Sequence, residues 1–229
     1  FFLYARNINK TFSIVSLGDY AVSMGQGLIL HNDFGAGKSS FVMNVKKAGR
    51  MIRPYSSVNE VNFFRGAGTV INLGRSWQAA AFFSYKPIDA TVDRDTIENS
   101  DFDAFGSIRF DGFHRTESEV ANKNSIHQTN AGLKLEYKLR NFKIAANGLY
   151  TGFDAPLIRD EALYRKYLFN GKQLVNASVD YSWRLRNLTF FGETAMSDNG
   201  GMAQIHGVLM GLDRRVDVSA VYRNYDPDY

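Results

Sequence analysis

Apolar and polar residues alternate along several long stretches of this sequence. From position 175 to 185, every odd residue is apolar or aromatic and every even residue is polar. The same alternation runs through residues 133–140 and, less regularly, through 77–85 and 216–222. A two-residue period over about ten residues places apolar side chains on one face of a β-strand and polar side chains on the other. Helical periodicity is weak, so the sequence predicts an all-β chain.

Short turn motifs separate the alternating stretches. Residues 139–142 and 185–188 read Leu-Arg-Asn-Phe and Leu-Arg-Asn-Leu, and each predicts a two-residue hairpin turn. Turns are also expected at 73–76, 212–215 and 17–20. Five hairpins correspond to about ten strands.

The connections between the hairpins are mostly long and polar. They cover residues 31–60, 87–127 and 153–172, and only 197–201 is short. Residues 87–127 hold nine acidic and four basic residues, whereas 31–60 hold five basic and two acidic ones. Tight turns at one end of a sheet and long loops at the other are typical of outer-membrane barrels.

Strand length and aromatic positions favour the same fold. Strands of about ten residues exceed the five or six that are usual in soluble proteins. Two groups of aromatic residues are placed as interfacial girdles would be, near the tight turns and near the long loops: Tyr137, Tyr181 and Trp183, and Tyr85, Tyr150 and Tyr225. No apolar run exceeds five residues, whereas a membrane-spanning helix needs about 20.

We therefore expect an all-β fold, an antiparallel transmembrane β-barrel in a bacterial outer membrane, with residues 1–229 forming a single domain. A soluble sandwich or a lipocalin-like barrel that binds a small apolar ligand shares the alternation and is the alternative. In a membrane barrel the polar face would line the lumen. Its charges have mixed sign, which favours internal ion pairs and plugging at least as much as an open pore: Lys134, Glu136, Lys138, Asp180, Arg184, Glu193, Asp217 and Arg223.

Basic residues near Tyr55 are candidates for binding phosphates of nucleic acid or lipopolysaccharide: Lys46, Lys47, Arg50 and Arg53. The alternative interpretation, which we favour, is a solvated loop. The net charge of +4 is too small to indicate nucleic acid by itself.

The densest polar cluster, residues 114–119, contains a second set of binding candidates, His114, Arg115 and Glu119. His114 with Asp111 or Glu117 could also serve a hydrolase at the barrel rim. The alternative is a salt-bridge cluster that anchors the loop, which we favour, so we expect no enzyme activity.

No cofactor or metal is expected. The chain has no Cys, which excludes disulfides, thiolate metal sites and a cysteine nucleophile. The four histidines lack a metal-binding spacing. Residues 35–40 resemble a phosphate loop, but the glycine that this motif requires is replaced by Asn32, so we interpret them as a glycine-rich loop. Gly25, Gly27, Gly66 and Gly68 fall in strand-like stretches, where glycine marks a bulge or the close approach of another segment.

An ordered series of short motifs runs through most of the chain. Its members are Gly18-Asp19-Tyr20, Gly25-Gln26-Gly27-Leu28, Lys38-Ser39, Arg53-Pro54-Tyr55-Ser56-Ser57 with Glu60, Phe64-Arg65-Gly66-Ala67, Phe113-His114-Arg115-Thr116 with Glu119, Gly192-Glu193 with Ala195, Asn199-Gly200-Gly201 with Ala203, and Tyr222-Arg223-Asn224-Tyr225. This series resembles the barrel region of the large Bacteroidetes outer-membrane proteins called helix-hairpin-helix domain proteins.

The resemblance implies an outer-membrane location and a barrel of which this chain is a fragment. In that family a helix-hairpin-helix segment, similar to those of competence DNA-binding proteins, precedes the barrel, and further strands follow the Tyr-Arg-Asn-Tyr motif. The implied role is a conduit, a docking platform or an assembly partner. The implied partners are outer-membrane lipid and other envelope proteins, with DNA implied by the resemblance alone.

Overall fold

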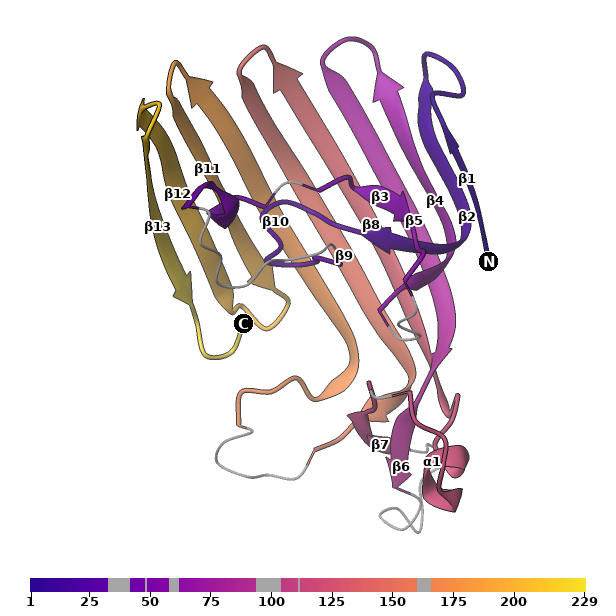
Figure 1. The fold of residues 1–229 in the computed structure, drawn as a ribbon. Helices are drawn as coiled ribbons and strands as arrows, with labels where there is room; N and C mark the ends of the chain where they lie inside the picture. The colour runs from indigo at the N-terminus through magenta and orange to yellow at the C-terminus, as the bar shows by residue number, and fades with distance from the viewer. Residues whose placement is uncertain (33–41, 48, 58–61, 94–103, 111, 160–165) are drawn as a thin grey trace.

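One large antiparallel sheet dominates the computed structural model, which describes residues 1–32, 42–47, 49–57, 62–93, 104–110, 112–159 and 166–229. Ten strands pair in the order β1-β2-β4-β5-β8-β9-β10-β11-β12-β13 (Figure 1). They are β1 (Phe2–Arg6), β2 (Phe12–Val22), β4 (Phe64–Leu73), β5 (Trp77–Ile88), β8 (Ile126–Leu139), β9 (Phe142–Leu157), β10 (Gly171–Leu185), β11 (Leu188–Ser197), β12 (Met202–Asp213) and β13 (Val216–Tyr225). The expected antiparallel fold and strand number are confirmed. Within the described residues β1 and β13 do not pair, so the sheet is open.

Tight turns join the strands into five hairpins at one end of the sheet. Four of them lie where the sequence predicts: Leu73 pairs with Trp77, Leu139 with Phe142, Leu185 with Leu188, and Asp213 with Val216. The prediction of a turn at 17–20 is wrong, because these residues lie inside β2. The first hairpin turns at 7–11 instead, where the Asn9 side chain accepts hydrogen bonds from the backbone N–H groups of Thr11 and Phe12 at 2.9 and 2.6 Å.

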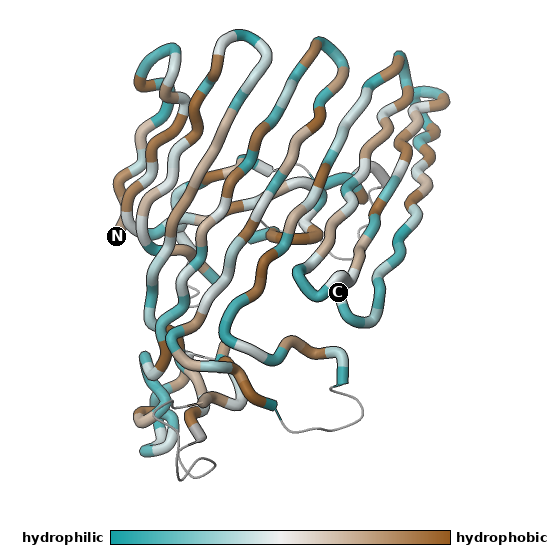
Figure 2. Tube along the Cα trace, turned by 180° about the vertical axis from the view of Figure 1, so that it is seen from behind, coloured by the Kyte–Doolittle hydropathy of each residue, from teal (hydrophilic) through white to brown (hydrophobic). Residues whose placement is uncertain are grey.

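The two faces of the sheet differ in polarity, as the alternation predicts. Leu133 and Val179 lie on the outer face and are 67% and 50% exposed, whereas Lys134 and Asp180 lie on the inner face. The strands are nearly in register, so this separation continues from strand to strand. For example, Lys134 of β8 is paired with Ala80 of β5 and with Asn147 of β9. Figure 2 shows the hydropathy changing along each strand.

A segment between β2 and β4 lies across the inner face of the sheet (Figure 1). We call residues 23–57 the inner segment, of which 33–41 and 48 are outside the described residues. It contains η1 (Val42–Val45), a 3-10 helix that packs against β13, and β3 (Ile52–Pro54), which pairs with β2. The expected long loop 31–60 therefore lies, in its described part, along the inner face of the sheet and contains β3, and Gly25 and Gly27 lie in this segment rather than in a strand.

Apolar residues fix the inner segment to the wall. Met24 and Ile52 are buried in a cluster with Val70, Phe82 and Leu149 of the sheet. A Cβ atom on Gly68 would lie 2.9 Å from Ile52 Cδ1, so glycine permits this close approach. The expectation that glycine marks contact with another segment is confirmed at this position.

The long connections gather at the other end of the sheet. Residues 87–127 contain β6 (Ala90–Asp93), β7 (Ala104–Ile108) and α1 (Glu117–Ala121). Phe105 of β7 packs with Phe153 and Leu157 of β9 in a second apolar cluster. β9 and β10 extend into the expected loop 153–172 and shorten it. Among the described residues, no helix is long and apolar enough to cross a membrane.

Candidate functional site: a basic cavity behind the inner segment

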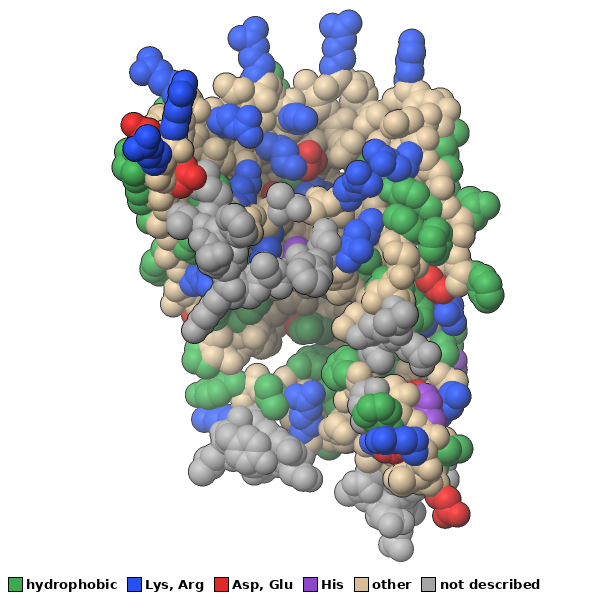
Figure 3. All heavy atoms as spheres, in the orientation of Figure 1, with side chains coloured by type: hydrophobic (Ala, Val, Ile, Leu, Met, Phe, Trp, Pro, Cys, Tyr) green, Lys and Arg blue, Asp and Glu red, His purple; other side chains and the backbone are tan. Residues whose placement is uncertain are grey.

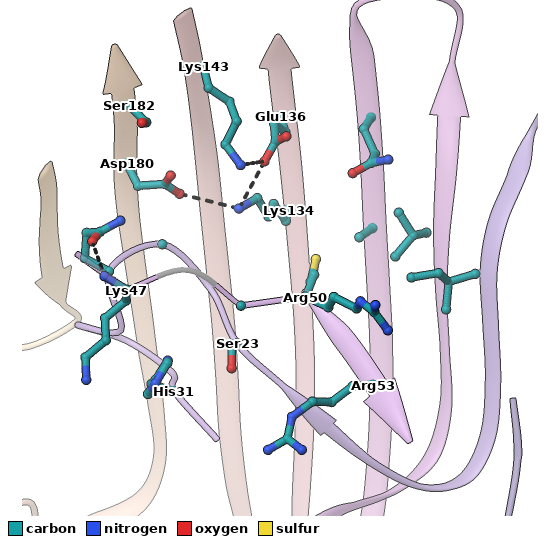
Figure 4. A pocket seen from close by; sticks show the side chains of 18 of the residues that line it. Ser23, His31, Lys47, Arg50, Arg53, Lys134, Glu136, Lys143, Asp180 and Ser182 are labelled. Atoms are coloured by element: carbon teal, nitrogen blue, oxygen red, sulfur yellow. Dashed lines mark hydrogen bonds and ion pairs between the residues drawn. The ribbon is translucent and has the colours of Figure 1, made fainter. Parts of the chain in front are cut away.

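A cavity of about 760 Å³ lies between the inner segment and the inner face of the sheet (Figure 4). The inner segment contributes basic side chains, and strands β8, β9 and β10 contribute residues of both signs. The charged residues and the histidine that line the cavity are His31, Lys46, Lys47, Arg50, Arg53, Lys134, Lys143, Glu136 and Asp180. The four basic residues singled out from the sequence are thus brought together, in a cavity rather than on an outer loop.

The two acidic residues of the cavity are already paired within the wall. Glu136 lies 3.4 Å from Lys134 Nζ and 3.0 Å from Lys143 Nζ, and Asp180 lies 3.6 Å from Lys134 Nζ. This network confirms the internal ion pairs that the mixed-sign lumen predicts. Because two acids face two wall lysines, the charges of the inner segment add a positive excess.

Lys46 shows the effect of that excess. Its Nζ donates a hydrogen bond of 2.7 Å to Ser182 Oγ. Burial lowers the pKa of Lys46, and repulsion from Lys143 and Arg184 lowers this pKa further. A bound anion would offset both effects.

Lys47 and Arg50 have a different environment. The Lys47 backbone N–H donates to Gln26 Oε1 at 3.0 Å, which fixes the chain, and Lys47 is among the residues that line the cavity. No acidic side chain within the described residues forms an ion pair with Lys47 or Arg50. Arg53, in contrast, donates from Nη2 to the carbonyl oxygen of Asn32 at 2.6 Å, an interaction within the inner segment.

A buried carboxylate holds the first part of the inner segment. Glu193 of β11 is fully buried and accepts hydrogen bonds from the backbone N–H groups of Gln26 at 2.6 Å and Leu28 at 3.1 Å. Ser178 Oγ donates a third at 2.7 Å. A Cβ atom at Gly25 would lie 2.6 Å from the Glu193 carboxyl, and Gly25 has φ +53°, so both space and backbone conformation favour glycine.

Sequence reasoning places Glu193 on the lumen side but does not assign it this role. Both Gly25-Gln26-Gly27 and Gly192-Glu193 belong to the motif series, and their joint presence is the sequence feature that could have indicated a contact between Glu193 and residues 25–27. Asn147 extends the buried network, since its Nδ2 donates to Ser178 Oγ at 3.1 Å and Asp180 Oδ2 at 2.9 Å.

His114, Arg115 and Glu119 lie apart from the cavity, in the 87–127 connection. His114 Nε2 lies 2.7 Å from Asp89 Oδ2, a pairing that the sequence does not indicate. No hydrogen bond or ion pair between His114 and Glu117 is present, and Asp111 lies outside the described residues. The small pocket beside His114 is lined by no Ser or Thr of the described residues that could act as a nucleophile. The rim hydrolase stays a prediction: His114 is paired with Asp89, and its expected partner Asp111 lies outside the described residues.

Glu119 caps α1. Its carboxylate accepts hydrogen bonds from the backbone N–H groups of Arg115 at 2.7 Å and Thr116 at 3.2 Å, and Thr116 completes the capping box. These hydrogen bonds lower the pKa of Glu119, and the one from the Arg115 backbone has the largest effect. Arg115 stacks over Phe113 with the guanidinium carbon 4.0 Å from the ring centroid. These contacts give Glu119 a structural role.

The described part of the chain contains no group of three or more His, Asp or Glu residues arranged to hold a metal ion. What the structure offers instead is a positively charged cavity on the inner face of a large sheet.

This chain is a mostly β protein built on one large antiparallel sheet. Two solved structures match nearly its whole length. One is OmpTdeltaL8, a loop L8 deletion mutant of the outer membrane protein OmpT of Vibrio cholerae, with 11% identity, a TM-score of 0.44, and coverage of 94% of this chain and 70% of that one. The other is in-vitro folded OmpT of Vibrio cholerae in its trimer form, with 11% identity, a TM-score of 0.41, and coverage of 95% and 67%. No protein-family model matches the sequence, and no curated protein matches it.

Proposed function

We propose that this chain forms the wall and the internal constriction of an outer-membrane β-barrel that admits small anions. The proposed role is non-enzymatic. The observation that carries it is the polarity of the two faces: apolar side chains are exposed on the outer face, while charged and amide side chains lie inside.

This arrangement is the reverse of what a soluble ligand-binding barrel requires. A soluble barrel exposes polar side chains and encloses apolar ones around an apolar ligand. Here the exposed outer face carries Leu133, Leu135, Phe83, Val179 and Trp183, and the cavity is basic. A lipid environment makes this outer face favourable.

The preference for anions follows from the charges of the cavity. Lys47 and Arg50 add positive charge beside acids that are already paired with Lys134 and Lys143. Charged walls of low dielectric concentrate ions of opposite sign. A volume of about 760 Å³ accommodates an inorganic ion or a small organic phosphate and is too small for duplex DNA.

The resemblance to the Bacteroidetes helix-hairpin-helix proteins supports the same location, and DNA capture is carried by that resemblance alone. The cavity position of Lys46, Lys47, Arg50 and Arg53 favours a small anion instead. If DNA were the partner, binding would be steeply salt-dependent and would weaken when these four residues are neutralised.

A sheet with open edges also places a requirement on the proposal. In hydrocarbon, each unpaired backbone N–H or C=O group costs roughly several kcal/mol. A sheet is therefore stable there only as a closed barrel. We infer that the free edges of β1 and β13 are paired in the membrane, and the family resemblance implies further strands after β13.

The test measures ion selectivity of the purified protein in planar bilayers. We expect a reversal potential that indicates anion preference, and a loss of that preference in Lys47→Gln/Arg50→Gln. The matched control, Lys123→Gln/Lys166→Gln, removes the same charge from the long-loop end and should leave selectivity unchanged. Conductance without anion preference would overturn the anion assignment. Protein that stays soluble and monomeric without detergent would overturn the membrane proposal.

A further inference from the structure

Basic residues occupy all five tight turns at one end of the sheet. The residues between the paired strand ends are 7–11, 74–76, 140–141, 186–187 and 214–215. They contain six Lys or Arg and no Asp or Glu: Lys10, Arg75, Arg140, Arg186, Arg214 and Arg215. All six are exposed, and Figure 3 shows basic side chains projecting from the hairpin ends. We call these six residues the basic rim.

The fold does not require these charges. No ion pair of the described residues includes a member of the basic rim. Arg140 and Arg186 have φ +40° and +53°, at the first position of two-residue turns. Glycine is the usual residue for positive φ at that position, and Asn tolerates it better than Arg. Arginine at two strained positions therefore points to a role for the side chain beyond the turn.

Exposed aromatic residues lie just below the basic rim on the outer face. Trp77 packs against Tyr137 in a tilted arrangement with 4.9 Å between ring centroids, and Trp183 packs likewise against Phe190 at 5.8 Å. Trp77 is two residues from Arg75, and Trp183 is three from Arg186, which corresponds to roughly 7–10 Å along a strand. Aromatic belts of membrane proteins lie at the level where hydrocarbon meets headgroups. The basic rim is thus placed at the level of the lipid phosphates.

We propose that the basic rim binds anionic glycerophospholipid headgroups, with the arginine guanidinium groups donating hydrogen bonds to phosphate oxygens. This inference rests on the proposed membrane location but not on conduction through the cavity. Guanidinium and phosphate match in charge and in paired hydrogen-bond geometry. Neighbouring hairpins present one arginine after another, so several headgroups are bound side by side.

The end of the sheet decides which anionic lipid is bound. In outer-membrane barrels the short turns face the periplasm and the long loops face outward. The periplasmic leaflet consists of glycerophospholipids, whereas lipid A belongs to the outer leaflet. The described part of the acid-rich connection 87–127 lies at the opposite end, so the basic surface belongs to the hairpin end of the sheet.

The experiment compares lipid association with the full protein reconstituted in phosphatidylcholine vesicles. Spin-labelled phosphatidylglycerol and phosphatidylcholine probes report the lipids bound at the protein surface. We expect phosphatidylglycerol to be preferred by roughly five-fold, which is the effect of about one neutralised charge per bound lipid, and this preference to shrink in high salt.

Variants locate the effect. Arg75→Gln/Arg140→Asn/Arg186→Asn/Arg214→Gln/Arg215→Gln should bring the preference close to one. The control Lys47→Gln/Arg50→Gln, which changes the cavity, should leave it unchanged. Arg140→Lys/Arg186→Lys keeps the charge and should retain most of the preference, which separates lipid binding from damage to the turns.

Three outcomes would overturn the inference: equal association of both probes with the wild type, an unchanged preference in the variant with five substitutions, or, with a spin-labelled lipid A as a third probe, a stronger preference for lipid A than for phosphatidylglycerol. Failure of the wild type to enter the phosphatidylcholine vesicles would instead refute the membrane proposal. Entry without lipid preference would refute only the present inference.

Discussion

Single residues determine whether the inner segment stays against the wall. Glu193 joins Gln26 and Leu28 of that segment to Ser178 of the wall through one buried carboxylate. The three donors make this buried acceptor important, because each donor left without an acceptor would pay its own desolvation cost. Glu193 therefore holds the first part of the inner segment, together with the buried Met24 and the Tyr229 hydroxyl.

We expect Glu193→Ala to loosen residues 24–30 without unfolding the sheet. Loss of the acceptor for two amides should cost about 2 kcal/mol locally, which corresponds to roughly thirty-fold faster amide exchange. Hydrogen exchange read by mass spectrometry checks this. Ser178→Ala keeps both amide bonds and should change exchange much less. Equal protection in Glu193→Ala and wild type would contradict the role given to Glu193.

The lowered pKa of Lys46 predicts how the anion preference depends on pH. Its pKa is lowered by burial and then by Lys143 and Arg184, while the facing acids Asp180 and Glu136 are paired with wall lysines. In the folded protein the charged form is therefore penalised at neutral pH, and the penalty is relieved as pH rises through the lowered pKa. Lys46 thus loses its charge below the ordinary lysine pKa of about 10.4.

We expect the anion preference to decline as pH rises from neutral toward that ordinary lysine value. In Lys46→Met the preference should start lower and decline less over the same range. Reversal potentials measured at a series of pH values check this. Parallel pH profiles in the two proteins would show that Lys46 does not carry the dependence.

At the scale of elements, the positions of four hairpins could be predicted from the sequence, because a hairpin depends on its turn residues and on the alternation in the two strands beside it. The Leu-Arg-Asn turns at 139–142 and 185–188 lie between strands whose alternation fixes the register. The turn expected at 17–20 failed because Gly18 and Asp19 have a tertiary role inside β2. There Asp19 accepts a 2.7 Å hydrogen bond from Arg65 Nε on β4, a contact between residues 46 apart.

The position of the inner segment could not be predicted from the sequence for the reason that applies to residues 17–20: it depends on contacts between residues that are distant in the sequence. Its position depends on contacts with Glu193 and with the apolar residues of β4, β5 and β9, all distant in sequence. Composition identified its basic residues but could not tell a cavity from an outer loop. The candidate residues were therefore found, while their location was not.

The strained turns carry a prediction of their own. Arg140→Asn should leave stability unchanged or raise it by up to about 1 kcal/mol, because Asn tolerates positive φ better than Arg. Arg75 does not have positive φ, so Arg75→Asn should bring no such gain. Urea unfolding in lipid vesicles compares the two. A larger loss of stability in Arg140→Asn than in Arg75→Asn would contradict this account.

At the scale of the whole molecule, the outer face distinguishes a membrane wall from a soluble sheet. Leu133 and Ile8 are both exposed, but Leu133 lies within β8 on the outer face and Ile8 lies in a tight turn. In water, a lysine at either exposed position is nearly neutral for stability. In a bilayer, a lysine at the midplane costs about 2–4 kcal/mol, and one near the interface costs little.

We therefore expect Leu133→Lys to reduce the free energy of unfolding in lipid vesicles by about 2–4 kcal/mol, and Ile8→Lys to change it little. Chemical denaturation followed by tryptophan fluorescence gives both values. Small, equal effects of the two substitutions would remove the support that the outer face gives to the membrane proposal.

The connection between the inner segment and the last strands also sets the timing of assembly. Leu28 is bound by Glu193 and by Tyr229, residues that follow it by 165 and 201 positions. Contacts this far apart form late, because the chain between them must first be ordered. We therefore expect the inner segment to reach its place against β11 late in folding, after the strands between them in the sequence have paired.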